Sequence, residues 1–162
     1  MDYRQTALWL KERLPIVPDT AIILGTGLSD LAESADILFR MSYKDIPGFV
    51  SSTAPSHQGN LIIGLLSGIP ILFLQGRFHY YEGYSMPQVV FPTRVISALG
   101  ISNLIVTNAS GSLKEELEPG AIVQIRDHIN FMGTNPLIGE HCDDFGQRFP
   151  DMSGVYSSRL AS

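Results

Sequence analysis

The sequence predicts an α/β fold. Two nearly unbroken apolar runs, residues 61–66 and 69–75, are separated only by Ser67 and Gly68, a pattern typical of a β-hairpin buried on both faces of a sheet. The strand that includes Ile71 is followed by an amphipathic helix and then by another apolar strand, which is typical of a βαβ unit. Helices and strands therefore alternate around one sheet.

The first predicted elements are a helix and a short strand. Residues 1–14 mix apolar and charged side chains at helical spacing, which predicts a short amphipathic helix that ends at Pro15. Residues 21–24 (Ala-Ile-Ile-Leu) predict a strand that stops at Gly25-Thr26-Gly27. Residues 28–35 then return to helical spacing.

The helix that follows the hairpin is predicted over residues 86–99. Ser85 is its candidate N-cap and Gly100 its stop signal. Pro92 lies inside this run, so the helix is either kinked there or begins there. Residues 102–107 predict the next strand, which leads into a polar turn at 108–111.

The last third of the chain has weaker patterns. Residues 122–126 predict one more strand, which 127–131 would extend. From Gly133 onward the chain is rich in Gly, Pro, Asn and Asp, and a tail of about thirty residues without structure is unusual in a compact domain. We therefore expect a single domain over residues 1–162 whose fold continues beyond the given sequence.

The composition argues against several classes of function. The net charge is −5 and the basic residues are scattered, whereas a nucleic-acid surface needs a basic stripe. Cys142 is the only cysteine, and its neighbours His141, Asp143 and Asp144 lack the separated ligand pairs of a metal site, so we expect neither disulfide nor metal. We expect a cytoplasmic protein, because no apolar run resembles a signal peptide or a membrane span.

Residues 75–83 (Gln-Gly-Arg-Phe-His-Tyr-Tyr-Glu-Gly) hold the densest group of chemically useful side chains. In an extended segment residues i and i+2 face the same side, so Arg77, His79 and Tyr81 can point into one pocket. A buried strand that ends in glycine and then presents such groups is typical of an anion and polyol site. The alternative is that Arg77 and Glu82 form a surface ion pair and that the aromatic side chains belong to the core.

Three predicted strands end in a polar loop that contains glycine, at residues 25–27, 76–79 and 108–111. Ligands of open α/β sheets bind beyond the carboxyl ends of strands, so we expect these loops to converge. The first loop lacks the Lys-Ser/Thr pair of a P-loop, and Asp30 stands where a dinucleotide loop has its third glycine. NAD and ATP are therefore disfavoured. Orthophosphate fits better, since a few N–H donors, a hydroxyl and one arginine can hold it.

Three further residues leave alternatives open. Gly25 and Gly27 can equally be glycines that only the turn requires. His57 lies in the polar turn Ser56-His57-Gln58-Gly59-Asn60, which favours an exposed or a functional histidine over one in the core.

Seven motifs follow one another between Leu8 and Tyr156: GTGL at 25–28, IPGF at 46–49, SHQG at 56–59, QGRFHYYEGY at 75–84, VTNA at 106–109, RDHIN at 126–130 and GQRFPDMS at 146–153. Together they resemble the purine nucleoside phosphorylases of the trimeric class. The resemblance implies a mixed central β-sheet with flanking helices, the nucleoside phosphorylase fold, and a homotrimer.

The resemblance also implies a reaction. Inorganic phosphate, as co-substrate and without a cofactor, would cleave the N-glycosidic bond of purine (deoxy)ribonucleosides such as inosine and guanosine. The products would be the free base and (deoxy)ribose 1-phosphate, a step of purine salvage.

Residue roles carry over by motif as expectations. The candidate catalytic residues are His79 and Asn108. Tyr81 would contact the ribose, and Phe145 resembles the aromatic residue that one subunit lends to the ribose pocket of its neighbour. The expected phosphate-binding residues are Thr26, His57 (guarding phosphate access), Arg77, His79 and, through its backbone N–H, Ala109.

The sequence departs from the family pattern in two ways. The turn after Asn108 continues Ala-Ser-Gly-Ser-Leu, and its Gly-Ser-Leu ending also occurs in methylthioadenosine phosphorylases, so that activity remains an alternative. Family members also continue past the position of Ser162, and the residues that grip and protonate the purine lie there. The chain is thus expected to be the N-terminal part of the family's domain. A catalytically incomplete fragment that keeps the phosphate and ribose site is the second alternative.

Overall fold

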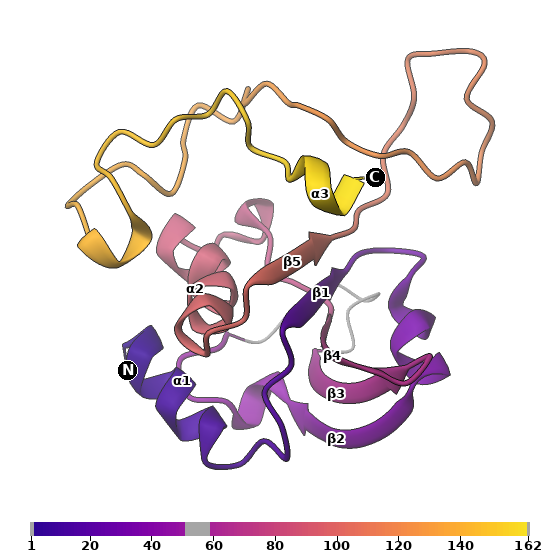
Figure 1. The fold of residues 1–162 in the computed structure, drawn as a ribbon. Helices are drawn as coiled ribbons and strands as arrows, with labels where there is room; N and C mark the ends of the chain where they lie inside the picture. The colour runs from indigo at the N-terminus through magenta and orange to yellow at the C-terminus, as the bar shows by residue number, and fades with distance from the viewer. Residues whose placement is uncertain (1, 51–58, 162) are drawn as a thin grey trace. The chain divides into compact units, whose positions relative to one another are not determined.

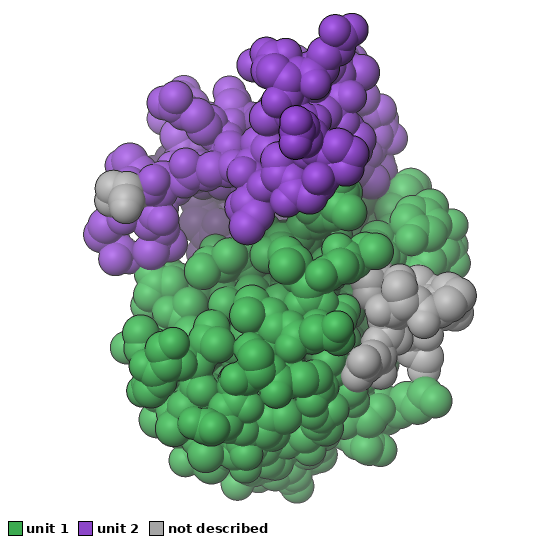
Figure 2. Space-filling model, turned by 90° about the vertical axis from the view of Figure 1, so that its right-hand side faces the viewer, with its two compact units in different colours: residues 1–110 green, residues 111–162 purple. Residues whose placement is uncertain are grey.

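The computed structural model describes residues 2–50 and 59–161. The chain divides into two compact units, residues 1–110 and 111–162 (Figure 2). The first unit holds a five-stranded sheet, whereas the described part of the second is almost entirely irregular.

The sheet is mixed, as expected, with strand order β2-β3-β4-β1-β5 (Figure 1). β2 (Asp36–Ser42), β3 (Asn60–Leu66) and β4 (Ile69–Gln75) are antiparallel neighbours, whereas β1 (Thr20–Leu24) runs parallel to both β4 and β5 (Asn103–Val106). The predicted strand–helix–strand unit is therefore present, and β1 lies between its two strands. The carboxyl ends of β4, β1 and β5 consequently meet at one edge of the sheet.

The predicted hairpin is confirmed in detail. Leu66 of β3 pairs with Ile69 of β4, and the two residues between them, Ser67 and Gly68, have φ of 51° and 79°. Positive φ at both central residues is the type I′ geometry that matches the twist of two-residue hairpins. The central residues of both strands are buried on both faces.

Successive strand residues face opposite sides of the sheet, so the core consists of two layers, one on each face. On one face Ile23, Leu72 and Leu74 pack against the helices α1 (Tyr3–Lys11) and α2 (Met86–Ala98), which lie side by side (Figure 1). On the other face the alternate strand residues pack against Ala32 and Ala35, in and just after the 3₁₀ helix η1 (Ser29–Ser34). These strand residues are Ile22, Leu24, Ile62, Ile71 and Phe73.

The ends of α2 follow the predicted signals. Gln88 Oε1 accepts hydrogen bonds from the backbone N and from Oγ of the N-cap Ser85, at 2.9 and 2.8 Å. At the other end Gly100 has φ of 89°, and the Ile101 N–H donates to the Ile96 carbonyl at 3.3 Å, the pattern of a glycine-terminated helix. The helix is continuous through Pro92, so it does not begin there.

The sequence did not predict β2, which lies at one edge of the sheet. Its register with β3 shifts between Ile37 and Phe39, and this irregularity interrupts the period-2 pattern. Phe39 and Met41 do pack against the core while Arg40 points to the other side, so a short alternation was present in the sequence.

The strand predicted over residues 122–126 and its extension to 131 are wrong for the described structure. These residues are irregular, and Ile122 is 98% exposed. A strand forms only when a neighbour accepts its backbone hydrogen bonds, and no described strand pairs with this segment. The irregular stretch expected after Gly133 is confirmed, with only η4 (Asp143–Phe145) and the short helix α3 (Ser158–Ala161) as regular elements.

Candidate phosphate site at the carboxyl edge of the sheet

The loops that follow β1, β4 and β5 converge, as the sequence predicted. The Gly25 N–H after β1 donates a hydrogen bond of 2.9 Å to Thr107 Oγ1 after β5. Thr107 Oγ1 in turn donates to the Ile23 carbonyl at 3.2 Å, so one hydroxyl joins the two strand ends. This contact is possible because β1 and β5 pair in parallel, so their carboxyl ends lie side by side.

Gly25 is a point of close approach between all three loops. A Cβ at this position would lie 2.5 Å from the Thr107 carbonyl oxygen, 2.8 Å from Arg77 Nη2 and 3.0 Å from the Asn108 Cα. Two of these contacts are with backbone atoms that cannot move away easily. Glycine is therefore required here for more than the turn, since the Arg77 guanidinium lies directly against its backbone.

Arg77 is half-buried, and one of its hydrogen-bond donors is unpaired within residues 2–50 and 59–161. Its Nε is buried and has no partner among the residues that the structure describes. Burial lowers the pKa of this guanidinium from its ordinary value, and the Tyr81 hydroxyl opposes that shift. Arginine nevertheless stays charged in proteins. A buried donor without an acceptor is unfavourable, so the position fits an anion.

His79 is held by Glu82. The Glu82 carboxylate accepts a hydrogen bond from the His79 backbone N at 2.8 Å and lies 2.9 Å from Nδ1 of the same residue. The Glu82 side chain is only 3% exposed, so the surface ion pair with Arg77 considered above is wrong. When Nδ1–H faces the carboxylate, the ring orientation is fixed and Nε2 is directed elsewhere.

The aromatic residues of this segment have different environments. Phe78 is buried among Tyr43, Phe49 and Tyr84, with ring centroids between 5.5 and 6.1 Å apart. Tyr81, in contrast, is 78% exposed and stacks on His79 at 4.7 Å. Phe78 thus anchors the segment in the core, whereas Tyr81 is available for a ligand.

The other predicted phosphate ligands lie on the same edge of the sheet. Thr26 is exposed on the turn that follows Gly25. A hydrogen bond of 3.2 Å from the Leu28 N–H to the Gly25 carbonyl closes this turn. Asn108 and Ala109 are exposed directly after Thr107, and Asn108 Nδ2 donates to the Ala109 carbonyl at 3.2 Å.

The structure does not test the placement of two predicted residues. His57 lies outside the described residues. Phe145 lies in η4 of the second unit and is 37% exposed. Across residues 2–50 and 59–161, no three His, Cys, Asp or Glu side chains are grouped as a metal site requires.

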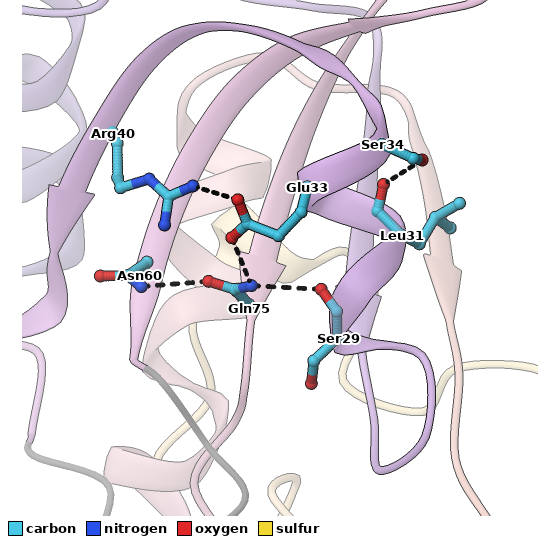
Figure 3. A network of polar contacts seen from close by, with 7 residues as sticks. All are labelled: Ser29, Leu31, Glu33, Ser34, Arg40, Asn60 and Gln75. Atoms are coloured by element: carbon cyan, nitrogen blue, oxygen red, sulfur yellow. Dashed lines mark hydrogen bonds and ion pairs between the residues drawn. The ribbon is translucent and has the colours of Figure 1, made fainter.

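Two residues that support the loops were given no role in the sequence analysis. The buried Tyr43 donates from Oη to the Gly76 carbonyl at 2.8 Å. The buried Gln75 side chain joins a network with Ser29, Glu33 and Asn60 (Figure 3). The sequence contained one sign of the role of Gln75, because a polar residue there directly follows the apolar run Ile71–Leu74.

In the part of the chain that the structure covers, no helix has the length and apolar character needed to cross a membrane.

Known proteins are similar to the chain over nearly its whole length. A family model described as "Phosphorylase superfamily" matches residues 19–162. Purine nucleoside phosphorylase 1 of Bacillus subtilis (strain 168) is 50% identical over 158 residues, which are 98% of this chain and 58% of that protein. The purine nucleoside phosphorylase of Rattus norvegicus is 46% identical over 158 residues, 96% of this chain and 55% of the relative.

A solved structure gives the same result. The crystal structure of Schistosoma mansoni purine nucleoside phosphorylase in complex with adenosine superposes with a TM-score of 0.89 at 40% sequence identity, and the match covers 98% of this chain and 57% of that one. The chain therefore spans a little more than half the length of the relatives it matches.

Proposed function

The chain belongs to the phosphorylase superfamily, and on that basis we propose that it supplies the phosphate and ribose side of a purine nucleoside phosphorylase. The reaction is phosphate-dependent cleavage of the N-glycosidic bond of purine (deoxy)ribonucleosides. It yields the free base and (deoxy)ribose 1-phosphate and serves purine salvage. Inosine and guanosine are the proposed substrates, and phosphate is a co-substrate with no cofactor needed.

One observation carries this proposal. The guanidinium of Arg77 lies against Gly25, whose backbone also approaches Thr107 and Asn108, and its buried Nε has no acceptor among the described residues. A phosphate oxygen is the acceptor that this arrangement suits, because Thr26 and Ala109, on the turns that follow the two neighbouring strands, are exposed and carry hydroxyl and N–H donors.

Each site residue has its own role in this proposal. Arg77, His79, Thr26 and the Ala109 N–H bind phosphate, and Asn108 shapes the turn beside them. Tyr81, stacked on His79, contacts the ribose. Departure of the base leaves an oxocarbenium-like sugar, so a fixed phosphate below it is both nucleophile and electrostatic stabiliser. His79, oriented by Glu82, keeps that anion in place.

Assembly and location complete the proposal. The two units belong to one phosphorylase domain, of which this chain is the N-terminal part; the single family match over residues 19–162 supports this. The protein is a cytoplasmic homotrimer in which Phe145 reaches the ribose pocket of a neighbouring subunit and His57 guards phosphate access. These points rest on the family resemblance of the motifs.

The test is the replacement Arg77→Ala. It should raise the phosphate KM or lower kcat/KM for phosphate-dependent inosine cleavage by about 100-fold or more, on the order of 3 kcal/mol. Arg4→Ala, which removes an exposed arginine of α1, is the charge-matched control and should leave both constants unchanged. Near-wild-type phosphorolysis by Arg77→Ala would refute the assignment.

Two further readouts separate the alternatives. Cleavage of methylthioadenosine in preference to inosine would assign the sister activity that the Gly111-Ser112-Leu113 ending keeps open. Calorimetric titration with inorganic phosphate, in the absence of nucleoside, reports on the phosphate site alone. Phosphate binding without cleavage of any nucleoside would identify a catalytically incomplete chain.

A further inference from the structure

Gln75, the last residue of β4, is a polar side chain with no exposed surface. It lies on the sheet face that η1 covers, next in the alternation after Ile71 and Phe73. A leucine or methionine of similar size would continue this apolar core without the desolvation of an amide. Packing alone therefore does not explain a glutamine here.

Every hydrogen-bonding group of the Gln75 carboxamide is used (Figure 3). Nε2 donates to the Ser29 carbonyl at 3.1 Å and to Glu33 Oε1 at 3.0 Å, while Oε1 accepts from Asn60 Nδ2 at 3.0 Å. The Ser29 carbonyl and the Glu33 carboxylate are both acceptors, so only the NH₂ group can face them. The orientation of the amide is therefore fixed.

The Glu33 carboxylate is itself held in place. Arg40 Nη2 lies 2.6 Å from Glu33 Oε2 and leaves Oε1 for Gln75. This ion pair is half-exposed, at 38% for Arg40 and 40% for Glu33, so solvent weakens it. The hydrogen bond between Gln75 and the Ser29 carbonyl involves neither Arg40 nor Glu33.

The position of Ser29 gives this contact its consequence. Ser29 follows the Gly25–Leu28 turn, which carries Thr26, while Arg77 comes two residues after Gln75. The start of the turn is fixed by the Gly25 hydrogen bond to Thr107, and Gln75 fixes its end. One side chain thus joins the segment that holds Thr26 to the segment that holds Arg77.

We propose that Gln75 is a positioning residue, whose carboxamide sets the separation between the Gly25–Leu28 turn and Arg77 and so determines the phosphate affinity of the site. This inference rests on the proposed function, since it concerns the same site. It assigns no contact between Gln75 and phosphate. Directional hydrogen bonds from a fully paired buried group hold ligand-binding residues more narrowly than apolar packing does.

The experiment compares Gln75→Met with the unmodified protein. Calorimetric titration with inorganic phosphate measures the phosphate Kd, and denaturant unfolding measures the stability of each protein. Methionine fills a similar volume but cannot donate to Ser29, so the phosphate Kd of the folded variant should rise about tenfold, the effect of losing one oriented hydrogen bond. Arg40→Gln is the matched control, because it removes the ion pair to Glu33 and leaves the Ser29 contact intact. Its phosphate Kd should stay within about twofold.

A second variant keeps the test decisive if Gln75→Met does not fold. In Gln75→Glu the new carboxylate faces the Glu33 carboxylate and the Ser29 carbonyl, and all three are acceptors at neutral pH. At about pH 5 the new carboxyl takes up a proton and can again donate a hydrogen bond to the Ser29 carbonyl. The phosphate Kd, taken as a ratio to the unmodified protein at the same pH, should therefore fall as the pH is lowered.

The outcomes separate the two proposals. If the unmodified protein binds phosphate and the Gln75 variants bind it equally well at every pH, the positioning role is overturned and the proposed function stands. If Gln75→Met is less stable but has an unchanged Kd, Gln75 is structural only and the inference is also overturned. If the unmodified protein binds no phosphate, the phosphate site itself fails, and the role of Gln75 fails with it.

Discussion

The Tyr43 hydroxyl donates a hydrogen bond of 2.8 Å to the carbonyl oxygen of Gly76, the residue between β4 and Arg77. Burial raises the pKa of Tyr43 well above its ordinary value, so the hydroxyl remains a protonated donor throughout the pH range in which the protein is handled. The ring of Tyr43 also stacks on Phe49 and contacts Phe78 edge-on. Tyr43 therefore holds the segment that presents Arg77 from below, through both its ring and its hydroxyl.

Tyr43→Phe should weaken phosphate binding as well as stability. The ring contacts remain, but the Gly76 carbonyl loses its buried donor, at a cost of about 1–3 kcal/mol in the free energy of unfolding. Thr6→Val is a matched control, because Thr6 Oγ1 also donates to a carbonyl, that of Pro47, at 2.8 Å. Both variants should lose stability in denaturant unfolding, and only Tyr43→Phe should raise the phosphate Kd. Equal phosphate affinities in the two variants would contradict this.

Gly25→Ala should disrupt the meeting point of the loops. The new methyl group would overlap the Thr107 carbonyl and the Arg77 guanidinium, and relief requires the loops to separate. Overpacking of this kind costs about 1–3 kcal/mol in unfolding free energy. If the same cost falls on binding, inorganic phosphate titrated by calorimetry should bind about fivefold more weakly or worse.

Gly154→Ala serves as the control for the glycine substitution. A Cβ there meets no atom within 4 Å, so its phosphate Kd and unfolding midpoint should match those of the unmodified protein. A Gly25→Ala variant indistinguishable from Gly154→Ala would show that the approach of the three loops is not critical.

Tyr81→Ala should affect the nucleoside and leave the fold intact. Tyr81 is 78% exposed, and substitutions at such positions usually change the unfolding free energy by no more than about 0.5 kcal/mol. If Tyr81 contacts ribose, its loss raises the KM for inosine, and the phosphate Kd changes little. Tyr80→Ala, at a neighbouring position that is 45% exposed, should leave the inosine KM unchanged. Steady-state kinetics with each substrate varied in turn distinguishes the two tyrosines.

The ion pair between Arg40 and Glu33 predicts a pH dependence of stability. The hydrogen bond from Arg40 is the main cause that lowers the pKa of Glu33 below its ordinary value of 4.5, and the hydrogen bond from Gln75 adds to it. A carboxylate with a lowered pKa stabilises the folded state above its unfolded pKa, and this stabilisation is lost as the pH falls through the folded pKa. In Arg40→Gln, the deficit in unfolding free energy should thus be largest at neutral pH and shrink below pH 4.5. A deficit that grows on acidification would contradict the sign.

Patterns confined to neighbouring residues were enough to predict most of the first unit. The apolar runs of β1, β3 and β4, the caps of α2 and the two-residue turn at Ser67-Gly68 are local signals, and each is found where expected. The convergence of the loops followed from a general property of parallel strands, applied to three glycine-containing strand ends. It needed no knowledge of individual contacts.

The parts that were missed depend on distant residues. Tyr43 reaches Gly76 across 33 positions and Gln75 reaches Ser29 across 46, and no local pattern indicates such partners. The strand predicted near Ile122 is the converse case, an element that was predicted but is not found. Its apolar sequence favours a strand, but β structure is stabilised by a neighbouring strand that a local pattern cannot supply.

The hydrogen bond between Gly25 and Thr107 also bears on how the protein folds, because it closes a loop of 82 residues. Contacts of such long sequence separation form late and slow the folding of a domain. The parallel pairing of β5 with β1 must therefore be complete before Arg77, Gly25 and Asn108 can meet. A partly folded chain has no phosphate site, so an anion bound there would stabilise the finished sheet alone, and the free energy of unfolding would rise with the logarithm of the anion concentration.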